Sequence, residues 1–271
     1  MASRYIPTTS AEQREMLRTI GVGSIDDLLA KVPQKARLSR PLQIPPALAE
    51  SELLARMRAM AAENADADSH VCFLGGGVYD HFVPLVINHM ILRGEFFTAY
   101  TPYQPEASQG TLRSIYEYQT MIAELTGMDV ANASIYDGAS SLAEAVLMAH
   151  SVTGRDEVVL SAAVNPLHRR VTATYGDGPG LTLRNCPAPE GAIDLDAALR
   201  LVTGKTAALV LQTPNFYGCL EDVAAAATIA HEAGALLIVA ADPVNLGVLE
   251  APGALGSDIV VGEGQIGRAH V

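Results

Sequence analysis

Cysteine is scarce in this chain of 271 residues: only Cys72, Cys186 and Cys219 occur, and they lie far apart. Their number is odd and no two form a Cys-x-x-Cys pair, which argues against both a disulfide framework and a zinc knuckle. The seven histidines show no spacing with one another or with carboxylates that is typical of metal ligands. The sequence therefore predicts reduced, buried thiols and no bound metal.

Basic residues are also few, because 18 Lys and Arg stand against 30 Asp and Glu and give a formal net charge of −12. Nucleic acids and anionic membranes are bound through basic surfaces, so neither is an expected partner. The chain has no run of 18 or more apolar residues that could span a membrane, and residues 1–15 lack the apolar core of a signal peptide. These absences predict a cytoplasmic protein.

Apolar residues, in contrast, make up 49% of the chain, enough for a sizeable core. The first 69 residues read as a helical arm. Thr9 and Glu12 have the spacing of a capping box, Ser24 precedes a second short helix, and a longer helix follows the Pro-rich segment 40–50. Such an arm either caps the domain that follows or packs on a partner.

From His70 onward, short apolar segments alternate with longer helical patterns. The predicted strands are residues 70–75, 130–136, 156–162, 181–186, 206–213, 235–241 and 258–262, and the clearest helices are residues 110–127, 139–154 and 220–234. This alternation predicts an α/β fold with a mostly parallel sheet covered by helices on both faces. A ligand site is then expected at the carboxyl ends of the strands, in the loops after Leu74, Tyr136, Thr213 and Ala241.

The segment FLGGGVYDHFVP places three glycines, Gly75 to Gly77, between a predicted strand and a helix. A dinucleotide-binding fingerprint requires a further glycine where this chain has Asp80, and a carboxylate there would repel a pyrophosphate. A tight turn is therefore favoured over the site of a nucleotide-binding oxidoreductase, which would show measurable affinity for NAD.

The segment NASIYDGASSLAEAVLMA has a turn of small residues before a helix. Free N–H groups from Gly138 onward, with the hydroxyls of Ser140 and Ser141, could hold an anion at the start of the helix. Asp137 opposes a phosphate there and could instead cap the helix. Asp242, which a proline follows, ends another strand either as a group that orients a cofactor nitrogen or as a turn former.

The segment FFTAYTPYQPEASQG is the most unusual, since it holds Tyr100 and Tyr103 around Pro102 and Pro105. The prolines stiffen a loop that is dense in hydroxyl, amide and carboxylate groups. A rigid polar and aromatic loop suits the recognition of a small polar ligand, or of a cofactor at an interface. The alternative is a turn whose rings fill a gap beneath it.

In this order, these segments resemble the glycine decarboxylase (P-protein) family of the glycine cleavage system, specifically its N-terminal half, which in many bacteria is a separate subunit 1. The likeness runs from about Arg4 to Gln265, and its most specific part is Thr98 to Ala139. The matching segments are RYIPTTSAEQREMLRTIGVGSIDDLLAKVP, RPLQIPPAL, FLGGGVYDHFVP, TAYTPYQPEASQGTLRSIYEYQTMIAELTGMDVANASIYDGAS and DIVVGEGQ.

This resemblance implies an enzyme that uses pyridoxal 5′-phosphate to decarboxylate glycine and passes the aminomethyl group to the lipoyl arm of H-protein. It implies a large domain of the aspartate-aminotransferase type (fold type I) over residues 70–265, with sites between paired subunits. It also implies that a lysine-bearing subunit 2 holds the cofactor. By the same likeness, the residues expected near the partner's cofactor are Tyr100, Thr101, Tyr103 and Gln104.

The lysine content agrees with that implication. A Schiff base requires a lysine at the ligand edge of the sheet. This chain has only Lys31 and Lys35 in the arm and Lys205 before a strand, at the opposite edge. The expected remnants of a cofactor pocket are Asp137, Gly138, Ser140, Ser141 and Asp242. Two alternatives stay open: a self-sufficient pyridoxal-phosphate lyase or transferase, and a structural scaffold that contributes no site residues.

The chain closes on DIVVGEGQIGRAHV, where a predicted strand leads into what looks like the start of a functional loop. Residues 266–271 depart from the family pattern and equal the in-frame translation of a widely used sequencing adapter, so we expect them to be a non-native tail. Members of the family continue with the rest of the sheet and a small C-terminal domain. We therefore expect an incomplete sheet, no small domain, and a fragment that is inactive even with its partner.

Overall fold

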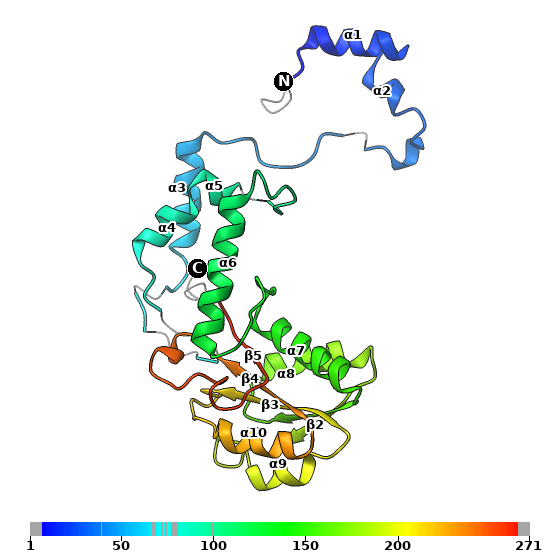
Figure 1. The fold of residues 1–271 in the computed structure, drawn as a ribbon. Coiled ribbons are helices and arrows are strands. Elements are labelled where there is room, and N and C mark those ends of the chain that lie inside the picture. Colours follow the sequence, from blue (N-terminus) through cyan, green and yellow to red (C-terminus); the bar gives the residue numbers. More distant parts are fainter. Residues whose placement is uncertain are drawn as a thin grey trace. The chain divides into compact units, whose positions relative to one another are not determined.

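The computed structural model describes residues 7–38, 40–66, 69–71, 73, 75–76, 81–98 and 100–264. The chain divides into two compact units, Met1–Ala65 and Asp66–Val271 (Figure 1). Several positions singled out in the sequence lie outside the described residues: Cys72, residues 77–80 with Gly77 and Asp80, and the C-terminal residues 265–271.

The first unit is helical. It consists of α1 (Ser10–Ile20), α2 (Ile25–Leu28), the short 3-10 helix η1 (Gln34–Ala36) and α3 (Glu50–Ala61). The predicted capping box is confirmed, because the Glu12 N–H donates to the Thr9 hydroxyl at 3.3 Å and the Thr9 N–H donates to the Glu12 carboxylate at 2.7 Å. Ser24 and Asp27 cap α2 in the same way. No described residue of this unit is buried, so local capping rather than a core stabilises its helices.

The second unit begins with helices that precede the sheet. They are α4 (Leu85–Ile91), α5 (Gly94–Phe97), α6 (Gln109–Thr126) and α7 (Gly138–Thr153). The predicted strand at 130–136 is wrong: the stretch is irregular, and Tyr136 is 84% exposed. A strand needs a neighbour for its N–H and C=O groups, whereas the Ala131 carbonyl accepts a hydrogen bond from the Gln119 side chain. The described residues of 70–75 also lie outside any strand.

A five-stranded parallel sheet forms the centre of the second unit. Its strands are β1 (Glu157–Ser161), β2 (Thr182–Cys186), β3 (Thr206–Thr213), β4 (Leu236–Ala241) and β5 (Ile259–Val261), in the order β2-β1-β3-β4-β5. The connections hold α8 (Pro166–Asp177), α9 (Leu195–Leu201), α10 (Val223–Glu232) and the 3-10 helix η2 (Asn245–Gly247). The five strands predicted from residue 156 onward are confirmed, as are the helices α6, α7 and α10.

The sheet is covered on both faces (Figure 1). Leu209 and Leu237 pack with α9 and α10 in one apolar cluster, while Val210 and Ile238 pack with Leu142 of α7 in another. Neighbouring residues of one strand thus enter opposite clusters, as the alternation of side chains in a strand requires. This arrangement confirms the prediction of a parallel sheet between two helical layers, built from continuous apolar strands.

The amino edge of the sheet is held by one arginine. The Nη1 of Arg155 donates to the carbonyls of Thr206 at 2.9 Å, Ala233 at 3.0 Å and Gly234 at 2.8 Å. These bonds tie the start of β3 to the turn that precedes β4. Lys205 stands immediately before β3 and therefore lies at this amino edge, as predicted.

Cys186, at the end of β2, is buried, and burial together with the nearby Asp194 carboxylate raises the pKa of its thiol to about 11.

Among the helices that the structure describes, none combines the length and the apolar content needed to cross a membrane.

Candidate functional site

The chain that follows β5 passes the carboxyl end of β4 and reaches the start of α7. Gly262 follows β5, and a Cβ on it would collide with the carbonyl oxygen of Ala241 at the end of β4. Only glycine permits this close approach of two backbones. The chain after β5 consequently passes next to the end of β4 and brings Glu263 to the first turn of α7.

The first turn of α7 is occupied by two carboxylates of the chain itself. Asp137 is the N-cap residue: its Oδ1 accepts from the Ser140 N–H at 2.7 Å, and its carbonyl accepts from the Ser141 hydroxyl at 2.6 Å. The Gly138 N–H donates to Oε2 of Glu263 at 3.0 Å. The amino end of the helix, which could attract an external anion, is thus already paired with negative groups.

His168 of α8 lies against the same turn. A Cβ added to Gly138 would stand 3.4 Å from its Cε1, and among the described residues no hydrogen-bond partner lies against its Nδ1. Burial lowers the pKa of His168, and the charges of Asp137 and Glu263 oppose that shift only in part. Hydrogen bonds from Ser140 lower the pKa of Asp137. At neutral pH the imidazole of His168 is therefore uncharged.

The lowered pKa of His168 gives a testable pH dependence. The free energy of unfolding is expected to fall as the pH drops below about 6.5, because the unfolded chain binds the proton more readily than the folded one. The stabilisation that comes from the neutral form of His168 is fully present above that pH. It is lost progressively as the pH falls to the pKa of His168 in the folded chain. His168→Gln should reduce this slope, whereas His89→Gln, at an exposed position of α4, should not. Urea unfolding between about pH 5 and pH 8 measures how the free energy of unfolding depends on pH. The same pH dependence in the parent chain and in both variants would refute the prediction.

The residues at this edge do not fit a phosphate-bearing cofactor held by a lysine. Lys205 lies at the opposite edge, and the first turn of α7 presents carboxylates where a phosphate would bind. Asp242 is engaged in a turn, since its carboxylate accepts from the Val244 N–H at 3.0 Å and from the Asn245 side chain at 3.1 Å. In the described part, no group of three His, Cys, Asp or Glu side chains is arranged to hold a metal ion either.

The other predicted site residues lie in the loop before α6. Tyr100 and Tyr103 are 81% and 77% exposed, with ring centroids 6.3 Å apart. The backbone is fixed locally: the Tyr103 N–H donates to the Thr101 carbonyl at 2.8 Å, and the Gln104 carbonyl accepts from the Ala107 N–H at 3.1 Å. The loop therefore presents its aromatic side chains outward on an ordered backbone. The alternative, a turn whose rings fill a gap beneath it, does not describe these two tyrosines.

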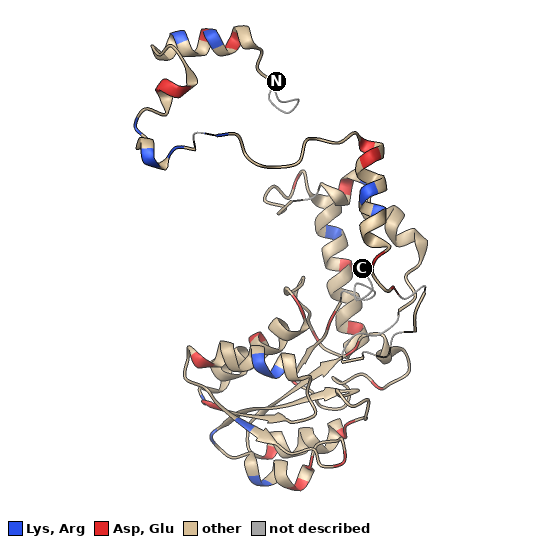
Figure 2. Cartoon of the chain, turned by 180° about the vertical axis from the view of Figure 1, so that it is seen from behind, with Lys and Arg blue, Asp and Glu red and all other residues tan. Residues whose placement is uncertain are grey.

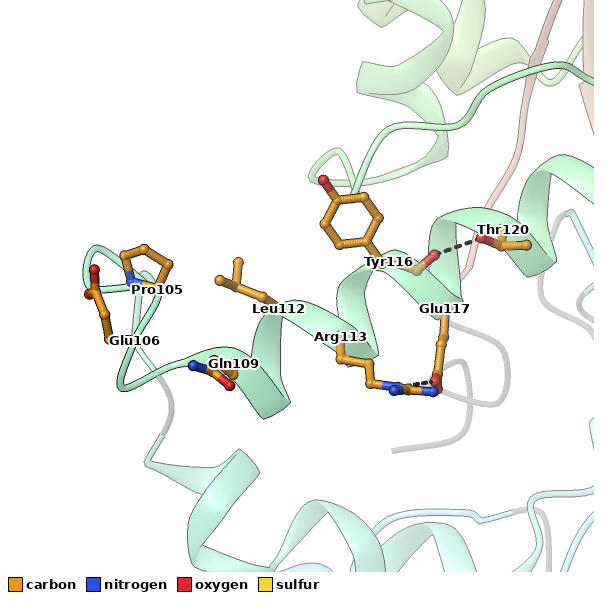
Figure 3. A pocket seen from close by; sticks show the side chains of 8 residues that line it. All are labelled: Pro105, Glu106, Gln109, Leu112, Arg113, Tyr116, Glu117 and Thr120. Carbon is orange, nitrogen blue, oxygen red and sulfur yellow. Dashed lines mark hydrogen bonds and ion pairs between the residues drawn. The ribbon is translucent and has the colours of Figure 1, made fainter.

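An open groove continues from this loop along α6 (Figure 3). Pro105, Glu106, Gln109, Leu112, Arg113, Tyr116, Glu117 and Thr120 line it. Leu112 and Tyr116 extend from one side of the helix, whereas Arg113 pairs with Glu117 at 2.8 Å on another (Figure 3). Acidic and basic residues also lie next to one another on α1 (Figure 2), where Arg18 pairs with Glu15 at 2.6 Å. The residues of each pair, Leu112 with Tyr116 and Arg113 with Glu117, are four positions apart and therefore lie on the same side of the helix. This spacing indicates the surface in the sequence, but the sequence analysis did not predict it.

The far end of α6 rests on the connection between β4 and β5. The Gly253 N–H donates to the Thr126 carbonyl at 2.9 Å, and Gly127, with a φ of 70°, ends the helix. The helix has 18 residues, which corresponds to about 27 Å. The predicted site residues thus form two separate groups, one at the sheet edge near α7 and one at the amino end of α6.

Residues 3–267 match the family described as glycine cleavage system P-protein. A probable glycine dehydrogenase (decarboxylating) subunit 1 from Chloroherpeton thalassium is 52% identical over 261 residues, which cover 96% of this chain and 59% of the relative. The chain thus spans well under two thirds of the length of that relative.

Two solved structures extend the comparison. A crystal structure of glycine decarboxylase (P-protein) of the glycine cleavage system, in inhibitor-bound form, aligns with a TM-score of 0.87 and 49% identity, covering 97% of this chain and 59% of that one. A sphingosine-1-phosphate lyase from Burkholderia pseudomallei aligns with a TM-score of 0.53 and 19% identity, over 84% of this chain and 55% of that one. The second likeness concerns the fold alone, and together they confirm the predicted fold class.

Proposed function

The chain belongs to the glycine cleavage system P-protein family, and we propose that it is the subunit without the catalytic lysine, subunit 1, of a glycine decarboxylase. In this proposal it assembles with the lysine-bearing subunit 2, which binds pyridoxal 5′-phosphate. The pair decarboxylates glycine and transfers the aminomethyl group to the lipoyl group of H-protein. A cytoplasmic location is part of the same proposal.

One observation gives the strongest support to the proposal that the partner subunit, and not this chain, binds the cofactor. The first turn of α7, where an anion could be held, pairs with Asp137 and Glu263 of the chain itself, while Lys205 lies at the amino edge of the sheet. When bound by the partner, pyridoxal phosphate supplies the electron sink for decarboxylation. A self-sufficient cofactor enzyme would need a lysine at the carboxyl edge, whereas Lys205, the lysine of the second unit among the residues that the structure describes, lies at the amino edge.

This chain would contribute to the partner's site through the loop before α6. Tyr103 offers a hydroxyl and Gln104 an amide, and both groups can donate a hydrogen bond to a carboxylate such as that of glycine. Because the backbone of the loop is fixed by its own hydrogen bonds, this backbone needs little further ordering on binding. The scaffold alternative assigns no such contact to the loop.

Reduction of the pyridoxal phosphate Schiff base tests the proposal. The full chain, alone and mixed with subunit 2, is incubated with pyridoxal phosphate and borohydride, and each subunit is weighed by mass spectrometry. Covalent labelling is expected on subunit 2 only. Stoichiometric labelling of this chain that disappears in Lys205→Arg would show that it carries its own cofactor, and the proposal would then be wrong.

A further inference from the structure

We propose that the Glu263 carboxylate is a built-in anion that occupies the amino end of α7, so that this chain does not accept a phosphate group there. The inference deepens the proposed function, because it names the group that would keep pyridoxal phosphate out of this subunit. It rests on contacts within this chain, so it can fail while the proposed function stands.

The contact is made where α7 would attract an anion most strongly. Gly138 is the first residue of this 16-residue helix and is buried, and its N–H donates to Oε2 of Glu263 at 3.0 Å. The Ser140 N–H donates to Asp137 at 2.7 Å. The free N–H groups and the dipole of a helix favour negative charge at this end. Two carboxylates therefore take the donors that an incoming phosphate would need.

The fold, rather than local sequence, places Glu263 at this position. The two partners are 125 positions apart in the chain, whereas the capping box of α1 joins residues three positions apart. Val261 of β5 pairs with Ala240 of β4, and Gly262 then passes the Ala241 carbonyl at a distance that admits no side chain. The carboxylate is thus carried on the end of a sheet strand.

Space and charge both favour Glu263 over an external phosphate. A Cβ added to Gly138 would lie 3.5 Å from Cβ of Glu263 and 3.4 Å from Cε1 of His168, so these two side chains lie directly against Gly138. A phosphate ester carries about −1.5 to −2 charges at neutral pH. It would have to displace the Glu263 carboxylate and would then face Asp137.

Hydrogen exchange of the Gly138 amide in the full chain tests whether the contact exists. Glu263→Ala is expected to accelerate this exchange about tenfold or more, because a charge-assisted hydrogen bond is lost. Glu263→Gln keeps an acceptor without the charge and should give a smaller increase. Glu250→Ala, at an exposed glutamate between β4 and β5, is the matched control and should change nothing. An unchanged exchange rate in Glu263→Ala would overturn the proposal.

Addition of inorganic phosphate then tests whether the amino end of α7 excludes an external phosphate group. Sodium chloride at the same ionic strength is the reference. Phosphate is expected to leave the Gly138 amide resonance unmoved in the parent chain and in Glu250→Ala, and to shift it in Glu263→Ala. A phosphate-dependent shift in the parent chain would show that the helix end is open. No shift in Glu263→Ala would assign the exclusion to Asp137 instead, and either result overturns the proposal. Neither readout requires subunit 2 or turnover, so the result is independent of the borohydride experiment.

Discussion

Replacement of Gly253 by alanine is expected to lower the free energy of unfolding of the second unit by about 3 kcal/mol, near the upper end of the usual cost of overpacking. The backbone of Gly253 lies against the end of α6, where a Cβ would collide with the Gly127 carbonyl and stand 2.9 Å from the Thr126 carbonyl. Because the obstacle is backbone, relief requires that α6 or the connection between β4 and β5 move as a whole. Urea unfolding followed by circular dichroism measures the effect.

Gly247→Ala provides the matched control for this substitution. Gly247 lies in the same connection, and nothing stands within 4 Å of an added Cβ. Its unfolding free energy should stay within about 0.5 kcal/mol of the parent value. If Gly253→Ala proves as stable as Gly247→Ala, the close approach of the two segments relaxes without cost and the predicted role of Gly253 is wrong.

When this chain is completed to the length of its relatives and reconstituted with subunit 2, Tyr103→Phe and Gln104→Ala are each expected to lower kcat/KM for glycine about tenfold or more. This prediction rests on the proposed function, in which the loop before α6 contacts the bound substrate. A hydrogen bond to a charged group contributes about 1.5–3 kcal/mol, and about 1.4 kcal/mol corresponds to a factor of ten. The two tyrosines of the loop already point outward, so the loop can meet a partner without unfolding.

The controls for these two variants separate a site contact from general damage. Tyr175→Phe removes a hydroxyl from α8, away from the loop, and should leave kcat/KM unchanged. Size-exclusion chromatography should show that the subunits of every variant still assemble. Normal kinetics in both loop variants, with intact assembly, would favour the scaffold alternative, in which this chain contributes no site residues.

The sheet could be predicted from the sequence because its strands are defined by their own composition. The run from Ala207 to Leu211 is continuously apolar and fully buried, as a strand covered on both faces must be. Residues 130–136 have a similar local pattern but no neighbouring strand to pair with, so the same reasoning failed there. Local patterns indicate the capacity to form a strand, whereas pairing is decided by the rest of the fold.

The contacts of the candidate site could be anticipated from the sequence only where they are local. Capping by Asp137 was one of two alternatives that the sequence offered, and the Ser140 N–H from which its carboxylate accepts lies three positions away. The contact between Glu263 and Gly138 spans 125 positions, so nothing near either residue indicates it. His168 gave no signal either, since a single histidine in a helix without metal spacing reads as an ordinary packed side chain.

The all-parallel order of the sheet has a consequence for how this protein is produced. Ile259 pairs with Ile238, 21 positions away, and Ala208 pairs with Val158, 50 positions away. Such long loops must close before any ladder becomes favourable, and topologies of this kind fold slowly. While they do, apolar runs such as β3 stay open to other chains. The yield of folded protein therefore depends on how fast the chain folds relative to how fast it aggregates. Slower synthesis at low temperature should raise this yield more than substitutions that stabilise the native state.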